Sequence, residues 1–258
     1  MSELLSVKNL SVRLRDTGAL ILKDVSFDLP VGSVGAIVGG SGSGKTTLGM
    51  ALLGLLPSAM WRSSGEIVFE GKDIVRLGDR ELQKVRGQRI GMVFQEPVSA
   101  FDPVYTVGFQ IAETLEAHGT SSGQKAAAHT LELLSLCGVP DPARIAGSYP
   151  HELSGGLRQR AMIALAIACN PPLLIADEPT SSLDVILQAR IIELFRDLRQ
   201  RLGLSILLIT HDLGVARALA DHVVVMNRGE VVEAGPVAKI LSGAGHAYTR
   251  ELIAAEDL

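Results

Sequence analysis

The stretch Gly39-Gly-Ser-Gly-Ser-Gly-Lys-Thr46, here called the phosphate loop, decides the fold of this chain. It follows a short apolar run at 34–38, predicted to be a strand, and leads into a predicted helix at 46–56. Strand, loop and helix in this order are the context that a phosphate-binding motif requires. A flexible Gly/Ser linker is the alternative, but a linker does not place Lys-Thr at this offset between a strand and a helix.

The glycines of the phosphate loop let backbone N–H groups point inward around a phosphate, where a Cβ would obstruct them. The start of the following helix adds its positive end. Lys45 supplies a point charge for the β- and γ-phosphates, and Thr46 offers a hydroxyl to Mg²⁺. The residues predicted to contact the nucleotide here are Gly39, Gly40, Ser41, Gly42, Ser43, Gly44, Lys45, Thr46 and Thr47.

Two carboxylates, Asp177 and Glu178, follow a second apolar run at 173–176. A strand there would end in Asp177 at the carboxyl edge of the sheet, where it can hold Mg²⁺ through water. Glu178 points differently and can polarise the water that attacks the γ-phosphate. An acidic pair that only caps a strand end is the alternative, and the phosphate loop makes it the weaker one. ATP and Mg²⁺ are therefore the predicted cofactors.

Two further polar residues follow predicted strands. His211 comes after a strand at 205–210 and is predicted to lie near the γ-phosphate, while Asp212 beside it is predicted to be a helix N-cap. Gln95 comes after a strand at 90–94, so that its amide can contact Mg²⁺ or the attacking water. A purely structural polar residue is the alternative for each. The other histidines form no cluster at ligand spacing, so no further metal site is predicted.

Strands and helices alternate over most of the chain, which predicts an α/β fold with a mainly parallel sheet covered by helices. From Glu96 to Ala168 the strand signals stop, which predicts an inserted helical subdomain. Further strands are predicted at 7–12, 22–29, 65–70 and 223–226, and further helices at 106–117, 124–137 and 186–202.

Composition excludes several classes of function. A net charge of −4 over 258 residues argues against a broad nucleic-acid footprint. Cys137 and Cys169 fit no metal spacing and are expected to be buried thiols in a reducing compartment. No secretory signal and no segment of about 20 apolar residues is found, so any membrane role is expected to act through a partner.

Leu153-Ser-Gly-Gly156 precedes a helix that begins near Leu157. Ser154 reads as an N-cap, with Gly155 and Gly156 as a permissive turn. Bare amides at a helix N-terminus also form an anion site. Since one loop already surrounds the phosphates, a second site is useful if it addresses the nucleotide of a neighbouring molecule.

The phosphate loop, Gln95, Leu-Ser-Gly-Gly, Asp177-Glu178, Ser182-Leu-Asp184 and His211 occur in the order seen in ATP-binding cassette (ABC) ATPases, which the chain resembles over nearly its whole length. The resemblance implies a P-loop NTPase with a RecA-like core at 1–94 and 169–240 that includes an N-terminal antiparallel β subdomain, a helical subdomain at 95–168 and a tail at 241–258. It also implies a head-to-tail dimer in which Ser154 and Gly156 contact the nucleotide of the partner, Asp184 communicates between the two sites, and Gln95 relays nucleotide state to a membrane partner.

The segment Tyr149-Pro-His-Glu-Leu-Ser-Gly-Gly-Leu-Arg-Gln-Arg160 resembles the peptide and nickel importer branch, as do Phe101-Asp-Pro-Val-Tyr-Thr-Val107 and His246-Ala-Tyr-Thr-Arg-Glu-Leu-Ile253. The implied system has two permease subunits, a second ATPase subunit (self or paralogue) and an extracytoplasmic solute-binding protein. This chain would then sit at the cytoplasmic face of the membrane and bind no nucleic acid.

Two features depart from the family pattern. Leu14 stands where the family stacks adenine on an aromatic residue, which keeps apolar contact without the stacking, worth about 1 kcal/mol. The chain also ends at Leu258 without a cysteine-bearing tail, which leans toward nickel-type or metallophore-type subunits.

The alternatives to an importer ATPase are an ABC ATPase of another transporter branch, a soluble ABC protein of DNA repair or translation, and an inactive scaffold. The single cassette and mildly acidic charge argue against the second, and intact Lys45, Glu178 and His211 argue against the third.

Overall fold

The computed structural model describes residues 3–181 and 183–256, so Ser182 of the Ser-Leu-Asp motif lies outside the described residues. The chain forms two compact units, of which unit 1 comprises 1–82 with 205–258 and unit 2 comprises 83–204. In chain order the elements are β1 (Glu3–Leu14), β2 (Leu20–Pro30), β3 (Val34–Val38), α1 (Lys45–Leu52), β4 (Trp61–Phe69), β5 (Lys72–Asp73), η1 (Ile74–Arg76), α2 (Asp79–Val85), β6 (Ile90–Val93), α3 (Val107–Ala117), α4 (Gln124–Leu136), α5 (Pro142–Ala146), η2 (Pro150–Glu152), α6 (Gly155–Ala166), β7 (Leu173–Asp177), α7 (Val185–Leu202), β8 (Ser205–Thr210), α8 (Leu213–Leu219), β9 (His222–Asn227), β10 (Glu230–Pro236), α9 (Val237–Ser242) and α10 (Ala247–Glu256).

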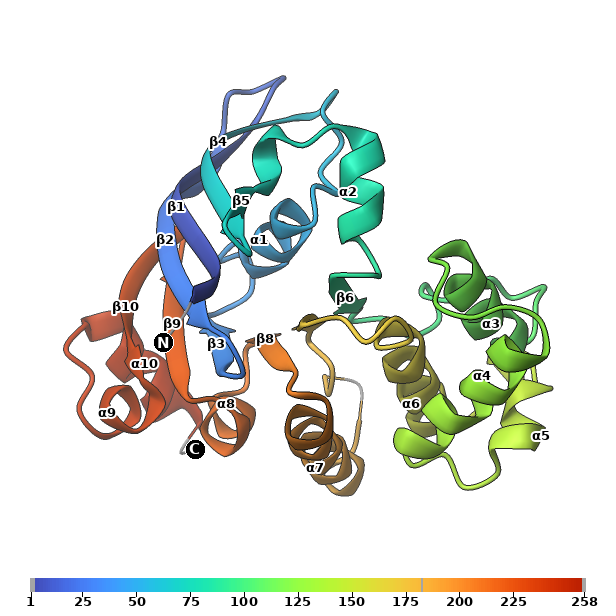
Figure 1. The fold of residues 1–258 in the computed structure, drawn as a ribbon. Helices are drawn as coiled ribbons and strands as arrows, with labels where there is room; N and C mark the ends of the chain where they lie inside the picture. Colours follow the sequence, from blue (N-terminus) through green and yellow to red (C-terminus); the bar gives the residue numbers. More distant parts are fainter. Residues whose placement is uncertain (1–2, 182, 257–258) are drawn as a thin grey trace. The chain divides into compact units, whose positions relative to one another are not determined.

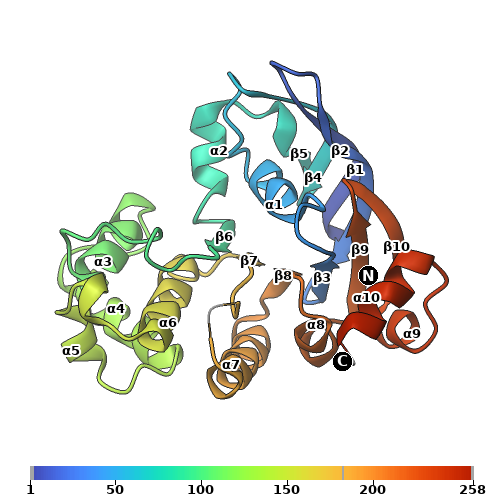
Figure 2. The ribbon, with the colours of Figure 1, turned by 180° about the vertical axis from the view of Figure 1, so that it is seen from behind.

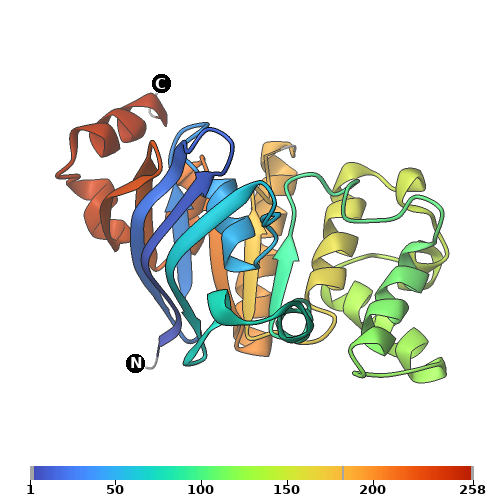
Figure 3. The same ribbon diagram turned by 90° about the horizontal axis from the view of Figure 1, so that it is seen from above.

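Unit 1 contains two sheets. The antiparallel one has the strand order β2-β1-β4-β5, and Figure 3 shows its long, curved strands in blue and cyan with α1 beside them. In the other, β3 pairs in parallel with β8 on one side and β9 on the other, and β10 pairs antiparallel with β9. Parallel pairing of the strand that precedes the phosphate loop was predicted and is confirmed.

Strands β3 and β8 are buried at every residue. Their sequences, VGAIV and SILLIT, are nearly continuous apolar runs, as expected for parallel strands that are covered on both faces. Helix α1 contacts β8, and α8 packs on both β3 and β8. The phosphate loop therefore leaves a strand that is fixed by packing over its whole length.

The C-terminal part of the chain belongs to unit 1. Helices α8, α9 and α10 gather beside β9 and β10, as the orange and red segments of Figure 1 show, and α10 contacts both α8 and β10. The tail is thus packed against β10, the strand that pairs with β9, and β9 in turn pairs with β3.

Unit 2 contains two parallel strands, β6 and β7, paired from Ile90 with Leu173 to Val93 with Ala176. The helices α3, α4, α5 and α6 contact one another and form a cluster, seen in green and yellow in Figure 2. The predicted helical insertion is present as this cluster. Its predicted limits at 95 and 168 stay a prediction, because the compact units divide the chain at other positions.

No helix among the described residues is both long enough and apolar enough to span a bilayer.

Candidate functional site

The phosphate loop needs glycine where the backbone of unit 1 closes around it. A Cβ at Gly39 would overlap the carbonyl of Met226 in β9 and lie 2.9 Å from the Ser43 hydroxyl. Gly44 has φ of 100°, and its Cβ would lie 2.8 Å from Leu22 of β2. Side chains at these positions would therefore force the loop open, which explains the glycine pattern without reference to a ligand.

Lys45 lies across the loop that it ends. Its Nζ donates to the carbonyl oxygens of Gly39, at 2.8 Å, and Gly40, at 3.1 Å, and the residue is only 8% exposed. The Ser43 hydroxyl is also buried and has no hydrogen-bond partner among the described residues. A buried ammonium and an unsatisfied hydroxyl in one loop fit an anion with several oxygens, such as a polyphosphate.

Helix α1 begins at Lys45 with no side chain capping its N-terminus. The N-cap residue is Gly44, which has no side chain that could accept a hydrogen bond. The N–H groups of the first turn, which includes Thr46 and Thr47, therefore have no capping side chain. The Thr46 side chain is exposed, so its hydroxyl can reach a ligand. This end of α1 has the uncapped start that the predicted anion site requires, and the site itself stays a prediction.

His211 lies next to the phosphate loop. The parallel register pairs Val38 with Thr210, so the residues that follow, Gly39 and His211, leave the sheet at the same edge. Asp212 accepts the N–H of Val215 at 2.9 Å, which confirms it as the N-cap of α8. The position of His211 near the γ-phosphate and its catalytic role both stay predictions.

Leu14 lies at the end of β1, and Trp61 of β4 is directly opposite it. Opposite residues of an antiparallel pair present their side chains on the same face, with Cβ atoms about 5 Å apart. Val12, one pleat earlier, pairs with Leu22, the residue that a Gly44 side chain would strike. Trp61 is therefore an aromatic neighbour of Leu14, and sequence reasoning missed it.

The two carboxylates of unit 2 follow one another at the end of β7. Asp177 is 3% exposed and Glu178 is 8% exposed. Glu178 has φ of 47°, in the left-handed region, where a residue with a Cβ is strained by about 1 kcal/mol or more. The strand conformation of Asp177 therefore ends at Glu178, while the separate roles predicted for the two carboxylates stay predictions. Gln95 follows β6, the strand paired with β7, and leaves the pair at the same edge.

Ser154 is the N-cap residue of α6, but its side chain makes no capping hydrogen bond. The expected position of Ser154 as N-cap is thus confirmed. The expected capping hydrogen bond is not formed, because the Ser154 hydroxyl accepts no N–H group of the first turn of α6. Gly156 faces α7, where an added Cβ would lie 3.4 Å from Leu187. Helix α6 is also fixed from its other side, since the buried amide of Gln159 donates to the carbonyl of Pro179 at 2.7 Å.

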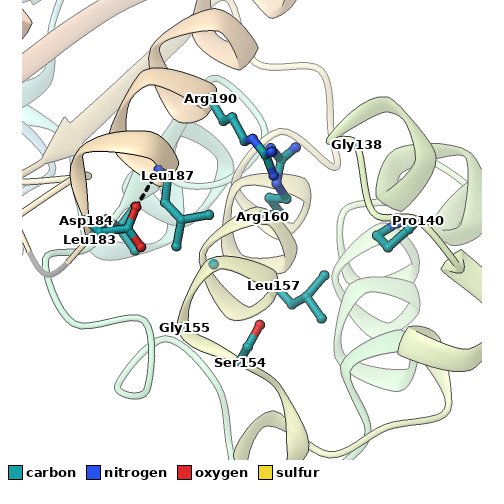
Figure 4. A pocket seen from close by; sticks show the side chains of 11 residues that line it. Gly138, Pro140, Ser154, Gly155, Leu157, Arg160, Leu183, Asp184, Leu187 and Arg190 are labelled. Atoms are coloured by element: carbon teal, nitrogen blue, oxygen red, sulfur yellow. Dashed lines mark hydrogen bonds between the residues drawn. The ribbon is translucent and has the colours of Figure 1, made fainter.

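A cavity of about 460 Å³ opens at the N-terminus of α6 within unit 2 (Figure 4). The guanidinium groups of Arg160 and Arg190 lie on one side of it, and Asp184 lies on another. One Asp184 oxygen accepts the N–H of Leu187 at 2.9 Å and so caps α7. The lining residues are Gly138, Pro140, Ser154, Gly155, Gly156, Leu157, Arg160, Leu183, Asp184, Leu187 and Arg190.

The family of the chain follows from comparison with known proteins. The sequence profile described as "ABC transporter" matches residues 22–181. The chain is 46% identical to the oligopeptide transport ATP-binding protein OppD of Bacillus subtilis over 257 residues, which are 98% of this chain and 72% of that protein. The chain belongs to the ABC transporter family. It is an ABC ATPase.

Two further comparisons support this ABC assignment. The peptidoglycan transport ATP-binding protein YejF of Agrobacterium fabrum is 50% identical over 256 residues; the match covers 98% of this chain but only 47% of YejF, about half its length. The solved structure of the ATP-binding cassette MJ0796, described as dimeric and bound to ADP and Pi, aligns with a TM-score of 0.79 at 30% identity, over 90% of this chain and 98% of that one. The predicted fold class is confirmed.

The ABC cassette brings its predicted residues together in two groups, one in each unit. The phosphate loop, Leu14 and His211 belong to unit 1, whereas Gln95, Asp177 and Glu178 belong to unit 2 together with the Ser154 segment. The oxygen donors predicted to hold Mg²⁺, on Thr46, Gln95 and Asp177, suit a hard cation.

One expectation about the cysteines is wrong. Cys137 is buried, and burial raises the pKa of its thiol to about 12, although Arg160 acts in the opposite sense. Cys169 is only half-buried, because it follows the end of α6 rather than lying within its packed part. Burial raises the pKa of Cys169 as well, while a hydrogen bond with Thr120 lowers it. The two thiols are therefore not equivalent.

Proposed function

We propose that this ABC ATPase energises an importer that takes up di- or oligopeptides through a membrane permease. The observation that carries the proposal is the 46% identity, over 98% of this chain and 72% of the relative, with a protein named for oligopeptide transport. Nickel or metal-chelate complexes are the second cargo class, because the sequence resembles the branch that includes both. The names of the relatives favour peptides and outweigh the inference drawn from the end of the chain.

In the proposed mechanism, the N–H groups of the phosphate loop and the ammonium of Lys45 hold the β- and γ-phosphates. Mg²⁺, held by Thr46, Gln95 and Asp177, would neutralise the charge that develops on the phosphate oxygens. Glu178 accepts a proton from the attacking water, and His211 orients the γ-phosphate. Binding, orientation and proton acceptance thus fall on separate groups.

The base is proposed to lie against Leu14 and Trp61. An indole face supplies the stacking that Leu14 lacks, worth about 1 kcal/mol. Trp61 is the one tryptophan of the chain, so its fluorescence reports on this contact directly. We expect Mg-ATP to quench that fluorescence and Trp61→Leu to weaken ATP binding about fivefold. Unchanged fluorescence at saturating Mg-ATP contradicts this placement.

The proposed working form is a head-to-tail pair of cassettes, formed with a second copy or a paralogue. Ser154 and Gly156 then contact the nucleotide of the partner, and Arg160 and Arg190 make the approach positive. Val185 and Ile186, directly after Asp184, are 81% and 69% exposed. Apolar side chains so exposed beside a functional residue are suited to burial by a partner. ATP can drive closure of the pair only through contacts that it makes in the closed state and lacks in the open state.

The proposed permease contact lies on unit 2 and comprises the exposed apolar residues Val98, Val104, Tyr105 and Phe109. All four are exposed, and the rings of Tyr105 and Phe109 stack with centroids 4.9 Å apart. Stacked exposed rings in the segment that follows Gln95 suit a partner that responds to nucleotide. Such a contact favours transport over a soluble ABC function. It would hold the chain at the cytoplasmic face of the membrane, beneath two permease subunits and an extracytoplasmic solute-binding protein.

The test is ATP hydrolysis by this chain reconstituted in lipid nanodiscs with candidate permease subunits and a candidate solute-binding protein. We expect a binding protein loaded with di- to octapeptides to stimulate hydrolysis, and the Glu178→Gln complex to bind ATP without turnover. If nickel–histidine stimulated ATP hydrolysis and peptides did not, nickel complexes would replace peptides as the proposed cargo. Stimulation by neither would contradict import of both.

A further inference from the structure

A side chain of the C-terminal tail contacts the phosphate loop. Tyr248, in the first turn of α10, accepts the N–H of Gly40 on its hydroxyl oxygen at 2.8 Å. The two residues are 208 positions apart, and both lie in unit 1. A Cβ at Gly40 would lie 3.1 Å from the same hydroxyl, which gives a steric reason for glycine at this second position of the loop.

Gly40 is held at both of its backbone polar groups. Its N–H goes to Tyr248, and its carbonyl accepts from Lys45. Lys45 is also the group that must turn toward the phosphates when nucleotide binds. Two side-chain hydrogen bonds to Gly40 have been described, one from Lys45 and one to Tyr248. When the Lys45 ammonium turns to the phosphates, the bond to the Tyr248 hydroxyl remains.

The tail is in turn anchored to β10. The Glu233 carboxylate accepts the N–H groups of Gly245, at 2.8 Å, and His246, at 3.1 Å. Arg250 adds a bond to the carbonyl of Gly245 at 2.7 Å. The pKa of Glu233 lies below its usual value, chiefly through the nearby Thr249 hydroxyl and also through these two N–H groups. The Thr249 hydroxyl makes no well-aligned hydrogen bond among the described residues, so we attribute its effect to its dipole.

These contacts close a circuit through unit 1. Strand β10 pairs with β9, β9 pairs with β3, and β3 leads into the phosphate loop that Tyr248 touches. Tyr248 is therefore held against Gly40 by paired strands and by the hydrogen bonds that join the tail to β10. A hydroxyl fixed in this way can keep the loop in one shape before the ligand arrives, which reduces the ordering cost of binding.

We propose that Tyr248 is a positioning residue for nucleotide binding, and that the tail braces the phosphate loop in its binding shape. The proposal rests on ATP binding by this loop and not on the transported cargo. Because coupling is reciprocal, bound nucleotide also stabilises the tail. The side chain acts through the loop backbone and does not touch the reacting atoms.

The test compares Tyr248→Phe with Ser26→Ala in the full chain. The control also removes one hydroxyl that accepts a backbone N–H in unit 1, the bond from Asn9 at 2.9 Å, away from the loop. The measurements are the Kd for AMP-PNP with Mg²⁺, kcat at saturating ATP, and hydrogen exchange of the peptide that spans the loop. We expect Tyr248→Phe to raise Kd about two- to twelvefold, to leave kcat within about twofold, and to speed exchange of the loop alone.

A Kd for Tyr248→Phe equal to that of wild type overturns the proposal, as does equal weakening by Ser26→Ala, which would reflect general stability. A fall in kcat at unchanged Kd overturns it as well, because that places Tyr248 in the chemistry. If the wild-type chain did not bind AMP-PNP, the proposed ATP site itself would be overturned. This outcome differs from failure of the Tyr248 proposal, because it appears in the chain without any substitution.

Discussion

Replacing Gln159 with methionine should separate fold stability from catalysis in unit 2. The wild-type amide donates to the Pro179 carbonyl at 2.7 Å, and the contact is buried. Methionine keeps the length of the side chain and leaves that carbonyl without this donor. A buried acceptor that loses its donor costs about 1–3 kcal/mol of folding free energy. For a chain of this size, each kcal/mol lowers Tm by about 2–4 °C.

The same substitution should slow hydrolysis. Pro179 follows Glu178, whose left-handed φ of 47° persists only if its surroundings hold it. Loss of about 1.4 kcal/mol of that restraint lowers kcat about tenfold. The Kd for ATP should stay within about twofold, because the phosphate loop belongs to unit 1. Thermal melts, initial rates of phosphate release and AMP-PNP titration measure the three quantities.

Gln110 provides the matched control. Its buried amide also donates to backbone carbonyls in unit 2, those of Asp102 at 2.9 Å and Tyr105 at 3.0 Å. Gln110→Met should lower Tm by at least as much, because the Gln110 amide oxygen also accepts the N–H of Asp102 at 2.8 Å, and it should leave kcat of the isolated chain unchanged. Equal kcat in the two variants would refute the link between α6 and Glu178, and an unchanged Tm in Gln159→Met would refute the energetic argument.

Three further predictions follow from backbone strain and titration. Gly44→Ala should abolish ATP binding through its clash with β2, whereas Gly203→Ala, which has positive φ but open space, should cost about 1 kcal/mol of stability and leave binding intact; titration calorimetry compares them. The native chain should react with a thiol reagent at Cys169 alone, because Cys137 is buried and its pKa is raised to about 12. The reaction at Cys169 should be faster at higher pH, because burial raises the pKa of that thiol as well. Modification of Cys137 at pH 8 would contradict this prediction. The pKa of Glu233 is lowered, so its contribution to stability is present above its unfolded pKa and is lost as pH falls through the folded value; melts should show Glu233→Gln less stable than wild type at pH 7, with the gap closing in acid, and a constant gap would contradict the assignment.

Elements built on continuous apolar runs could be predicted from the sequence. The predicted strands at 34–38 and 205–210 coincide with β3 and β8. Each run is buried throughout, so hydrophobicity alone marks its limits. The order of the motifs after these strands then placed Gly39 and His211 at the same edge, as the parallel register shows.

Elements whose ends depend on backbone conformation or tertiary pairing could not be predicted well. Helix α1 ends at Leu52 rather than at 56, because Gly54 takes φ of 60° although leucines continue beyond it. Strand β4 begins at Trp61 rather than at Gly65, since its polar start is held by pairing with β1 and not by burial. That earlier start is what brings Trp61 opposite Leu14.

Long-range side-chain bonds left no signal in the sequence. The bond from Gln159 to Pro179 crosses 20 positions, and the bond between Gly40 and Tyr248 crosses 208. Neither follows a periodicity or a spacing, because each depends on how separate elements pack. The short polar helix α2, with Leu82 as its one buried residue, was missed for the related reason that it has no apolar face.

The central claim is that hydrolysis requires each nucleotide to be enclosed by two cassettes. The most direct measurement is ATPase activity per molecule of this chain across a dilution series, with light scattering on the same samples under saturating Mg-ATP. The account predicts that specific activity falls with the fraction of dimer and approaches zero where only the 27.3 kDa monomer is present. Constant specific activity in samples that scatter as monomer would contradict it.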